Sequence, residues 1–296
     1  MSIPFADRVC ARILERRTAL VVGLDPVLEL FPEELQAMEV EQALVRFGQG
    51  VLSAIEPEVA AVKPQIAFFE RHGWRGLRAF QRLVEEASRL GIPVIVDCKR
   101  GDVGSTAEAY AEAFLGEDPE TPGPYVDAVT LNPYLGEDSM EPFRARAIQN
   151  HRGLFLLSRT SNPGGAQFQE RKSDGEPLYL AVARAVHGWG EGVTGAHGYG
   201  PFGLVAGATY PEALREIRAA APDALLLVPG LGFQGGDPHD LAVAFDARGL
   251  GALVSASRSV IYAYKNSGGT DWEAGVREAA QRTRKALERA RSGACR

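Results

Sequence analysis

Short apolar runs alternate with amphipathic stretches along most of this 296-residue chain. Apolar positions that recur every three or four residues predict helices, whereas short runs of Val, Ile, Leu and Ala without that period predict strands buried on both faces. The predicted strands are 19–24, 59–63, 93–97, 128–131, 154–158, 204–208, 224–229 and 252–256. The predicted helices include 74–90, 105–115, 177–188, 210–221, 237–248 and a charged final helix from 272 to about 291.

This alternation predicts an α/β fold. Strands that alternate with helices favour a parallel sheet, and eight such units in a chain of this length predict a (β/α)8 TIM barrel. An open, doubly wound sheet is the alternative topology. We expect one domain over residues 1–296, with the active site at the carboxyl ends of the strands, where most of the polar residues that border the strands are found.

Composition and charge exclude several classes of protein. The formal net charge of −6 leaves no basic excess, so we do not expect nucleic acid as a partner. No apolar run is long enough to span a bilayer and the first 17 residues lack the pattern of a signal peptide, so we expect a cytoplasmic protein. The three cysteines and five histidines show neither a disulfide framework nor metal-ligand spacing.

Acids and bases alternate where the third predicted strand ends. Residues i and i+2 of a strand share a face, so Asp97 and Lys99 are expected to point the same way, with Asp102 on the following loop. Lys63 ends the neighbouring second strand. An ion-pair network that supports the rim would explain any single pair, but four alternating charges at adjacent strand ends favour a functional site.

The charges indicate a type of chemistry. A lysine flanked by carboxylates keeps its proton, because neighbouring negative charge favours the ammonium form. It is then a fixed cation and a proton donor, suited to a reaction in which a carbanion develops nearby and must be stabilised and protonated. Decarboxylation has this character.

A phosphate site is predicted on the last two strands. The glycine-rich loop 230–236, which contains Gln234, frees backbone N–H groups for an anion, and Arg258 beyond the eighth strand offers a guanidinium suited to phosphate oxygens. Gly230-x-Gly232-x-x-Gly235 also fits a dinucleotide-binding pattern. The next strand ends without the acid that would hold a ribose, so we do not expect a nicotinamide cofactor.

The motif Asp97-x-Lys99-x-x-Asp102-Val103-Gly104-x-Thr106 resembles the signature of the orotidine 5′-monophosphate decarboxylase family. The resemblance covers most of the chain and is closest to the larger bacterial branch, type 2. It extends through Leu24-Asp25, Lys63, the segment 160–164, the loop 229–236 and Ser257-Arg258-Ser259. It implies a TIM-barrel carboxy-lyase that converts orotidine 5′-monophosphate to UMP in pyrimidine biosynthesis, with no cofactor and no metal.

The resemblance also implies residue roles. Lys99 would protonate C6 of the pyrimidine after CO2 leaves, with Asp97 beside the departing carboxylate. Asp25 and Lys63 would contact ribose hydroxyls, and Ser161 the pyrimidine edge. The 5′-phosphate would be held by three groups: the side chains of Gln234 and Arg258 and the backbone N–H near Ser257. Family enzymes are homodimers with sites at the subunit interface, so Asp102 and Thr106 would act in the partner's site.

Two other functions share part of this pattern. A magnesium-dependent sugar-phosphate decarboxylase or aldolase-like relative resembles the chain at Asp97, Lys99 and Asp102, but it carries an acid where this chain has Lys63. A non-catalytic nucleotide-binding barrel would need the phosphate loop without the charged array. The segment 188–203, rich in glycine and aromatic residues, is either a mobile lid over the substrate or a surface insertion.

Overall fold

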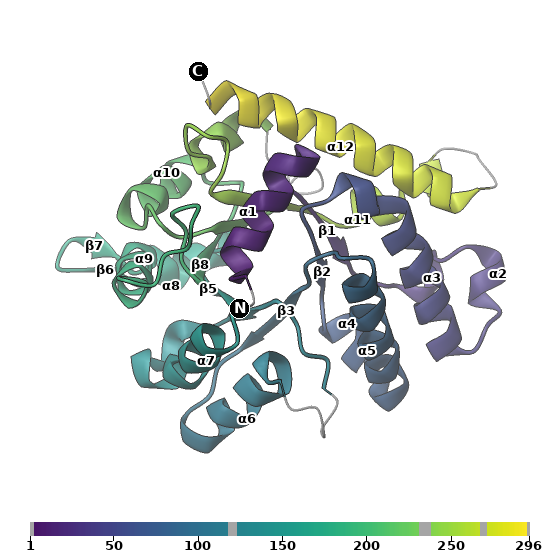
Figure 1. Ribbon diagram of the computed structural model, residues 1–296, viewed down its shortest axis with the longest axis horizontal. Coiled ribbons are helices and arrows are strands. Elements are labelled where there is room, and N and C mark those ends of the chain that lie inside the picture. Colours follow the sequence, from purple (N-terminus) through teal and green to yellow (C-terminus); the bar gives the residue numbers. More distant parts are fainter. Residues whose placement is uncertain (1–2, 118–122, 231–237, 267–270, 295–296) are drawn as a thin grey trace.

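The computed structural model describes residues 3–117, 123–230, 238–266 and 271–294 (Figure 1). Within these ranges eight parallel strands run side by side in the order β2, β1, β10, β9, β8, β5, β4, β3. Isolated parallel bridges, Val62 with Val94 and Gln65 with Asp97, join β2 to β3 and close the ring. The TIM barrel is confirmed, and the open-sheet alternative is wrong. The strands are β1 (Leu20–Leu24), β2 (Ala61–Pro64), β3 (Ile95–Arg100), β4 (Ala128–Leu131), β5 (Gly153–Arg159), β8 (Phe202–Ala206), β9 (Leu226–Pro229) and β10 (Ala252–Ala256).

Helices surround the barrel (Figure 1). None of those described is both long enough and apolar enough to cross a membrane. The α-helices are α1 (Phe5–Arg16), α2 (Glu33–Gln36), α3 (Val40–Ile55), α4 (Ala67–Glu70), α5 (Gly73–Arg89), α6 (Gly104–Leu115), α7 (Glu137–Gln149), α8 (Ala166–Gln169), α9 (Leu178–Trp189), α10 (Pro211–Ala220), α11 (Arg258–Ile261) and α12 (Trp272–Ala294). The 3₁₀ helices are η1 (Leu28–Leu30), η2 (Glu56–Glu58), η3 (Pro133–Leu135), η4 (Pro163–Gly165), η5 (Pro238–Ala244) and η6 (Ala263–Asn266).

The barrel interior is filled with apolar side chains, and α1 covers its amino-terminal end. The Phe5 ring of α1 packs edge-to-face on Phe155 of β5, with ring centroids 6.0 Å apart. Because the strands are parallel, their polar carboxyl ends all lie at the opposite rim of the barrel. One buried cluster combines α1 with residues from all eight strands, including Phe5, Val9, Ile13, Val21, Ala61, Ile95, Ala128, Phe155, Val205, Leu227 and Leu253.

The predicted helix 237–248 is wrong in type and length. The structure describes the 3₁₀ helix η5, which ends at Ala244. The Asp246 carboxylate then accepts hydrogen bonds from the backbone N–H groups of Arg248 and Leu250, both at 2.8 Å. Side-chain acceptors of this kind compete with helical hydrogen bonds, and Gly249 at φ +72° completes the turn.

A short hairpin follows α8 that the sequence analysis did not predict. Its strands β6 (Lys172–Ser173) and β7 (Glu176–Pro177) pair antiparallel. The two residues between them, Asp174 and Gly175, have φ of +53° and +85°. An Asp-Gly pair in this conformation is typical of a tight hairpin turn, so the signal was present in the sequence.

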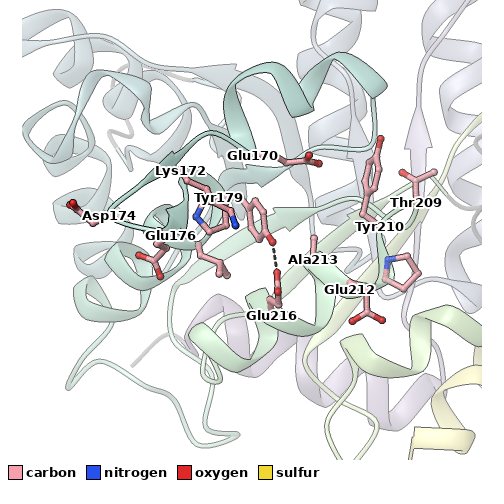
Figure 2. Close-up of a pocket in the computed structure, with 14 residues that line it drawn as sticks. Glu170, Lys172, Asp174, Glu176, Tyr179, Thr209, Tyr210, Glu212, Ala213 and Glu216 are labelled. Carbon is pink, nitrogen blue, oxygen red and sulfur yellow. Dashed lines mark hydrogen bonds between the residues drawn. The ribbon is translucent and has the colours of Figure 1, made fainter.

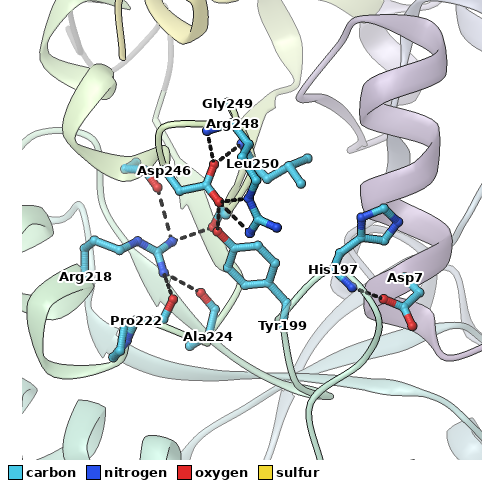
Figure 3. A network of polar contacts seen from close by, with 12 residues as sticks. Asp7, His197, Tyr199, Arg218, Pro222, Ala224, Asp246, Arg248, Gly249 and Leu250 are labelled. Atoms are coloured by element: carbon cyan, nitrogen blue, oxygen red, sulfur yellow. Dashed lines mark hydrogen bonds and ion pairs between the residues drawn. The ribbon is translucent and has the colours of Figure 1, made fainter. Parts of the chain in front are cut away.

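The segment 188–203 lies at the amino-terminal end of the barrel. It leads into the start of β8, and the Asp7 carboxylate of α1 accepts a 3.0 Å hydrogen bond from the backbone N–H of His197. The Tyr199 hydroxyl donates to Asp246 at 2.9 Å (Figure 3). These contacts place the segment opposite the carboxyl-terminal rim, so the lid interpretation is wrong and the segment is a packed insertion.

Candidate active site

A cavity of about 240 Å³ opens among the carboxyl ends of the strands. It lies where β1, β2, β3, β9 and β10 end, so five of the predicted site residues come together around it. Among the described residues, the lining is Asp25, Lys63, Gln65, Phe68, Asp97, Pro229, Gly230, Ser255, Ser257, Arg258 and Ser259.

Asp97 is the centre of the charged cluster. Lys63 Nζ donates a hydrogen bond of 2.9 Å to its Oδ2, and Lys99 Nζ donates one of 2.5 Å to its Oδ1. The Thr130 hydroxyl also donates to Oδ1, at 2.9 Å. The side chains of Lys63 and Asp97 are 9% and 12% exposed, whereas that of Lys99 is 46% exposed. Lys99 is therefore the ammonium of this cluster that is more open to an incoming molecule.

The electrostatics of the cluster keep Asp97 and Lys63 ionised. Burial by itself raises the pKa of Asp97, but attraction by Lys63 and Lys99 outweighs it and holds that pKa well below its usual range. Burial lowers the pKa of Lys63, but the carboxylates of Asp97 and Asp25 more than offset this, so the pKa lies above its ordinary value. Both groups carry charge at neutral pH.

Asp97 and Lys99 lie on a β-bulge in β3. The ladder between β3 and β4 pairs Val96 with Val129 and next pairs Arg100 with Leu131. Three residues of β3 therefore stand opposite Thr130 alone. Bulges of this kind occur next to active sites, where they redirect side chains.

The residues of the bulge point in different directions. Lys99 has φ +47°, a left-handed conformation that is uncommon outside glycine, and its side chain folds back to Asp97. Cys98 is buried on the other side, with its Sγ 3.4 Å from the Thr130 carbonyl oxygen. Burial raises the pKa of the Cys98 thiol to about 11, which fits a structural role.

Asp25 and Ser257 both line the cavity. Among the described residues, Oδ1 of Asp25 is buried without a hydrogen-bond partner, so it can accept a hydrogen bond from a bound molecule. Gly23 at the end of β1 lets the chain after β10 approach, because a Cβ there would lie 1.9 Å from Ser257 Oγ. Arg258 follows Ser257 at the rim.

Lys99 is not itself part of the cavity wall and joins it through its hydrogen bond to Asp97, and four other predicted site residues are not placed in the wall either. Asp102 lies on the loop after β3, where it accepts a 2.8 Å hydrogen bond from the N–H of Val103. Thr106 is exposed in the first turn of α6. Ser161 follows β5, and its carbonyl accepts a 3.2 Å hydrogen bond from the Thr209 hydroxyl. The fourth, Gln234, lies outside the described residues.

Sequence reasoning missed four polar or aromatic residues at the site: Gln65, Phe68, Ser255 and Thr130. Gln65 lies two residues beyond Lys63, so the strand period could have placed it on the same face. Thr130 is the only polar residue in the strand 128–131, but a threonine is common in strands and gives little signal.

A larger cavity of about 920 Å³ lies between the β6–β7 hairpin, α9 and α10 (Figure 2). Five carboxylates and one lysine are among its lining residues, and the Tyr179 hydroxyl donates to the Glu216 carboxylate. None of the predicted site residues that the structure describes lines it, and its negative charge disfavours a phosphate. In the described ranges, no three His, Cys, Asp or Glu side chains gather so as to hold a metal ion. The smaller cavity is therefore the candidate active site.

Comparisons with known proteins agree with this geometry. The family model described as "Orotidine 5'-phosphate decarboxylase / HUMPS family" matches residues 18–268. An orotidine 5′-phosphate decarboxylase of Rhodopirellula baltica is 41% identical over 289 residues, covering 93% of this chain and 96% of the relative. One of Deinococcus radiodurans is 44% identical over 264 residues, covering 89% and 91%.

Solved structures give the same result. A putative orotidine-monophosphate-decarboxylase of Toxoplasma gondii has a TM-score of 0.84 at 32% identity, covering 99% of this chain and 98% of that one. A putative orotidine 5′-phosphate decarboxylase of Streptomyces avermitilis has a TM-score of 0.82 at 34% identity, covering 98% and 97%.

Proposed function

This chain belongs to the orotidine 5′-phosphate decarboxylase / HUMPS family and decarboxylates orotidine 5′-monophosphate to UMP, and we propose that Lys99 supplies the proton that replaces the lost carboxylate. The observation that carries the proposal is the Lys99 ammonium, which is 46% exposed and held 2.5 Å from Asp97 in the cavity wall. A buried lysine at the end of β2 fits this reaction better than a magnesium-dependent one, since Lys63 would repel the metal.

The reaction needs one bond broken and one formed. The bond between C6 of the pyrimidine and its carboxylate breaks, CO2 leaves, and the electron pair stays on C6. Lys99 gives its proton to C6 and recovers one from solvent, which its 46% exposed side chain can reach. An ammonium held in place before the reaction stabilises the developing negative charge without reorganisation. Asp97, ionised beside the departing carboxylate, holds the Lys99 side chain in position.

The remaining contacts follow the residues around the cavity. Asp25 and Lys63 hold the ribose hydroxyls, which is supported by Oδ1 of Asp25, buried without a hydrogen-bond partner in the described part of the chain. Arg258 and the backbone near Ser257 hold the 5′-phosphate together with Gln234, and Ser161 contacts the pyrimidine edge. Binding energy from the phosphate, remote from C6, helps to order the substrate for reaction.

We also propose a homodimer that shares its active sites. Val103, beside Asp102, is 52% exposed, and Tyr134 and Leu135 on the loop after β4 are 78% and 49% exposed. The two loops are neighbours, because a Cβ on Gly101 would lie 2.7 Å from the carbonyl oxygen of Asn132. Exposed apolar groups of this kind are suited to an interface between copies. Such an interface would carry Asp102 and Thr106 toward the partner's cavity.

The experiment that tests this function is an absorbance assay of orotidine 5′-monophosphate turnover in excess chelator. We expect UMP formation at the same rate with and without the chelator. Turnover that stops on chelation and returns with magnesium would favour the sugar-phosphate type of mechanism. UMP binding without any turnover would favour the non-catalytic barrel.

A further inference from the structure

The Thr130 hydroxyl forms hydrogen bonds with both Lys99 and Asp97. Its oxygen accepts a 3.0 Å hydrogen bond from the backbone N–H of Lys99. The same hydroxyl donates its proton to Oδ1 of Asp97 at 2.9 Å. A hydroxyl has one proton and two acceptor lone pairs, so it can do both at once.

These two hydrogen bonds occur where the bulge interrupts the backbone hydrogen bonds between β3 and β4. Three residues of β3 face Thr130 alone, so regular strand pairing leaves backbone groups of the bulge without partners. An unpaired N–H in a partly buried position is costly, and the threonine side chain supplies the acceptor that the β4 backbone does not. The Thr130 side chain on β4 thereby fixes the backbone conformation of Lys99.

The contacts also close a ring. The backbone N–H of Lys99 donates to the Thr130 hydroxyl, and that hydroxyl donates to Oδ1 of Asp97. Nζ of Lys99 donates to the same Oδ1 at 2.5 Å. Both ends of the lysine are therefore tied to one carboxylate oxygen. A left-handed backbone at a non-glycine residue persists only when its surroundings hold it, and Thr130 is the neighbour that does so.

We infer that Thr130 is a positioning residue for the decarboxylation, holding Lys99 and Asp97 in the geometry that delivers the proton. The inference rests on the proposed role of Lys99. Thr130 itself is 1% exposed and is not among the described residues that line the cavity. Its contribution is expected in kcat, because a displacement of about 1 Å at the reacting group can cost about 100-fold in rate.

The test replaces the hydroxyl with a methyl group of similar size in Thr130→Val. We expect kcat for orotidine 5′-monophosphate to fall by about 10-fold to 100-fold, with KM and UMP affinity close to the parent values. Thr130→Ser keeps the hydroxyl and is expected to restore most of kcat. If valine prevents folding, Thr130→Ala and Thr130→Ser differ only by the hydroxyl and give the same comparison.

Thr18 provides a matched control. It is also 1% exposed, and its hydroxyl likewise accepts from a backbone N–H, that of Leu20 at 3.2 Å. It donates to the Glu58 carbonyl at 2.8 Å, at the amino end of β1 and far from the cavity. Thr18→Val thus also loses one accepted and one donated hydrogen bond, the donated one to a backbone carbonyl rather than to a carboxylate. We expect it to lower Tm while leaving kcat at the parent level.

Each outcome is decisive for Thr130. Parent kcat in Thr130→Val, no recovery in a folded Thr130→Ser, or an equal loss of kcat in Thr18→Val would overturn the inference. Assaying Lys99→Ala in parallel distinguishes a failure of the Thr130 inference from a failure of the proposed function. An inactive Lys99→Ala beside a fully active Thr130→Val removes only the positioning role, whereas a fully active Lys99→Ala removes the proposed role of Lys99.

Discussion

Lys63 and Asp97 lie on adjacent barrel strands, and Nζ of Lys63 donates a hydrogen bond of 2.9 Å to Oδ2 of Asp97. Both side chains are buried. The pair leaves the other carboxylate oxygen to Lys99 and Thr130. One aspartate therefore holds two lysines, of which Lys63 is enclosed and Lys99 is 46% exposed.

Removing the enclosed lysine is expected to destabilise the barrel. Lys63→Met leaves Asp25 and part of Asp97 without a buried counter-charge, and breaking such a pair costs about 3 kcal/mol of unfolding free energy. Urea denaturation at pH 7 measures the change. Lys172→Met, at an exposed position of the β6–β7 hairpin, is the control and is expected to match the parent. Equal stability of both variants would contradict the enclosed-pair account.

The dependence of stability on pH has a definite sign. The pKa of Asp97 is lowered on folding, so its contribution to stability is complete above the unfolded pKa of about 4 and is lost as pH falls below it. Asp97→Asn removes this contribution. We expect the unfolding free energy of the parent to fall more steeply between pH 6 and pH 3 than that of Asp97→Asn. Parallel curves from urea titrations would show that Asp97 is not the group concerned.

Arg258 is expected to act through the phosphate alone. Arg258→Ala removes hydrogen bonds to a charged group, worth about 1.5–3 kcal/mol, so kcat/KM for orotidine 5′-monophosphate is expected to fall by about 10-fold to 150-fold. The nucleoside orotidine lacks the phosphate, so its much slower turnover is expected to be the same in parent and variant. A similar loss with both substrates would place Arg258 in a different role.

The proposed dimer with shared active sites predicts complementation between inactive variants. Lys99→Ala and Asp102→Ala are each expected to be inactive alone. Mixing them under conditions that exchange subunits creates heterodimers with one intact site, with Lys99 from one subunit and Asp102 from the other. Random exchange of equal amounts gives about one quarter of the parent activity for a C2 dimer. A mixture that stays inactive although subunits exchange would show that Asp102 acts within its own subunit.

The strands and the clustering of the candidate site residues at one rim could be predicted from the sequence for physical reasons. Strands covered on both faces need continuous apolar runs, and parallel topology brings their carboxyl ends to one rim. Lys63 and Asp97 end two such runs, and the structure places them in contact.

The finer geometry could not be predicted, because it depends on contacts between elements. The bulge at Lys99 arises from the register between β3 and β4, and the role of Thr130 follows from that register. The segment 188–203 packs at the amino-terminal end because Asp7 of α1 holds it, a contact between residues far apart in the chain.

The measurement that tests the central claim most directly compares kcat and UMP affinity in Lys99→Ala, with Lys172→Ala as the control. Loss of the proton donor is expected to lower kcat by about 100-fold to 10,000-fold or more, while calorimetry shows UMP bound as in the parent. Lys172→Ala is expected to match the parent in both. Turnover at the parent rate in Lys99→Ala would contradict the claim that this ammonium protonates C6.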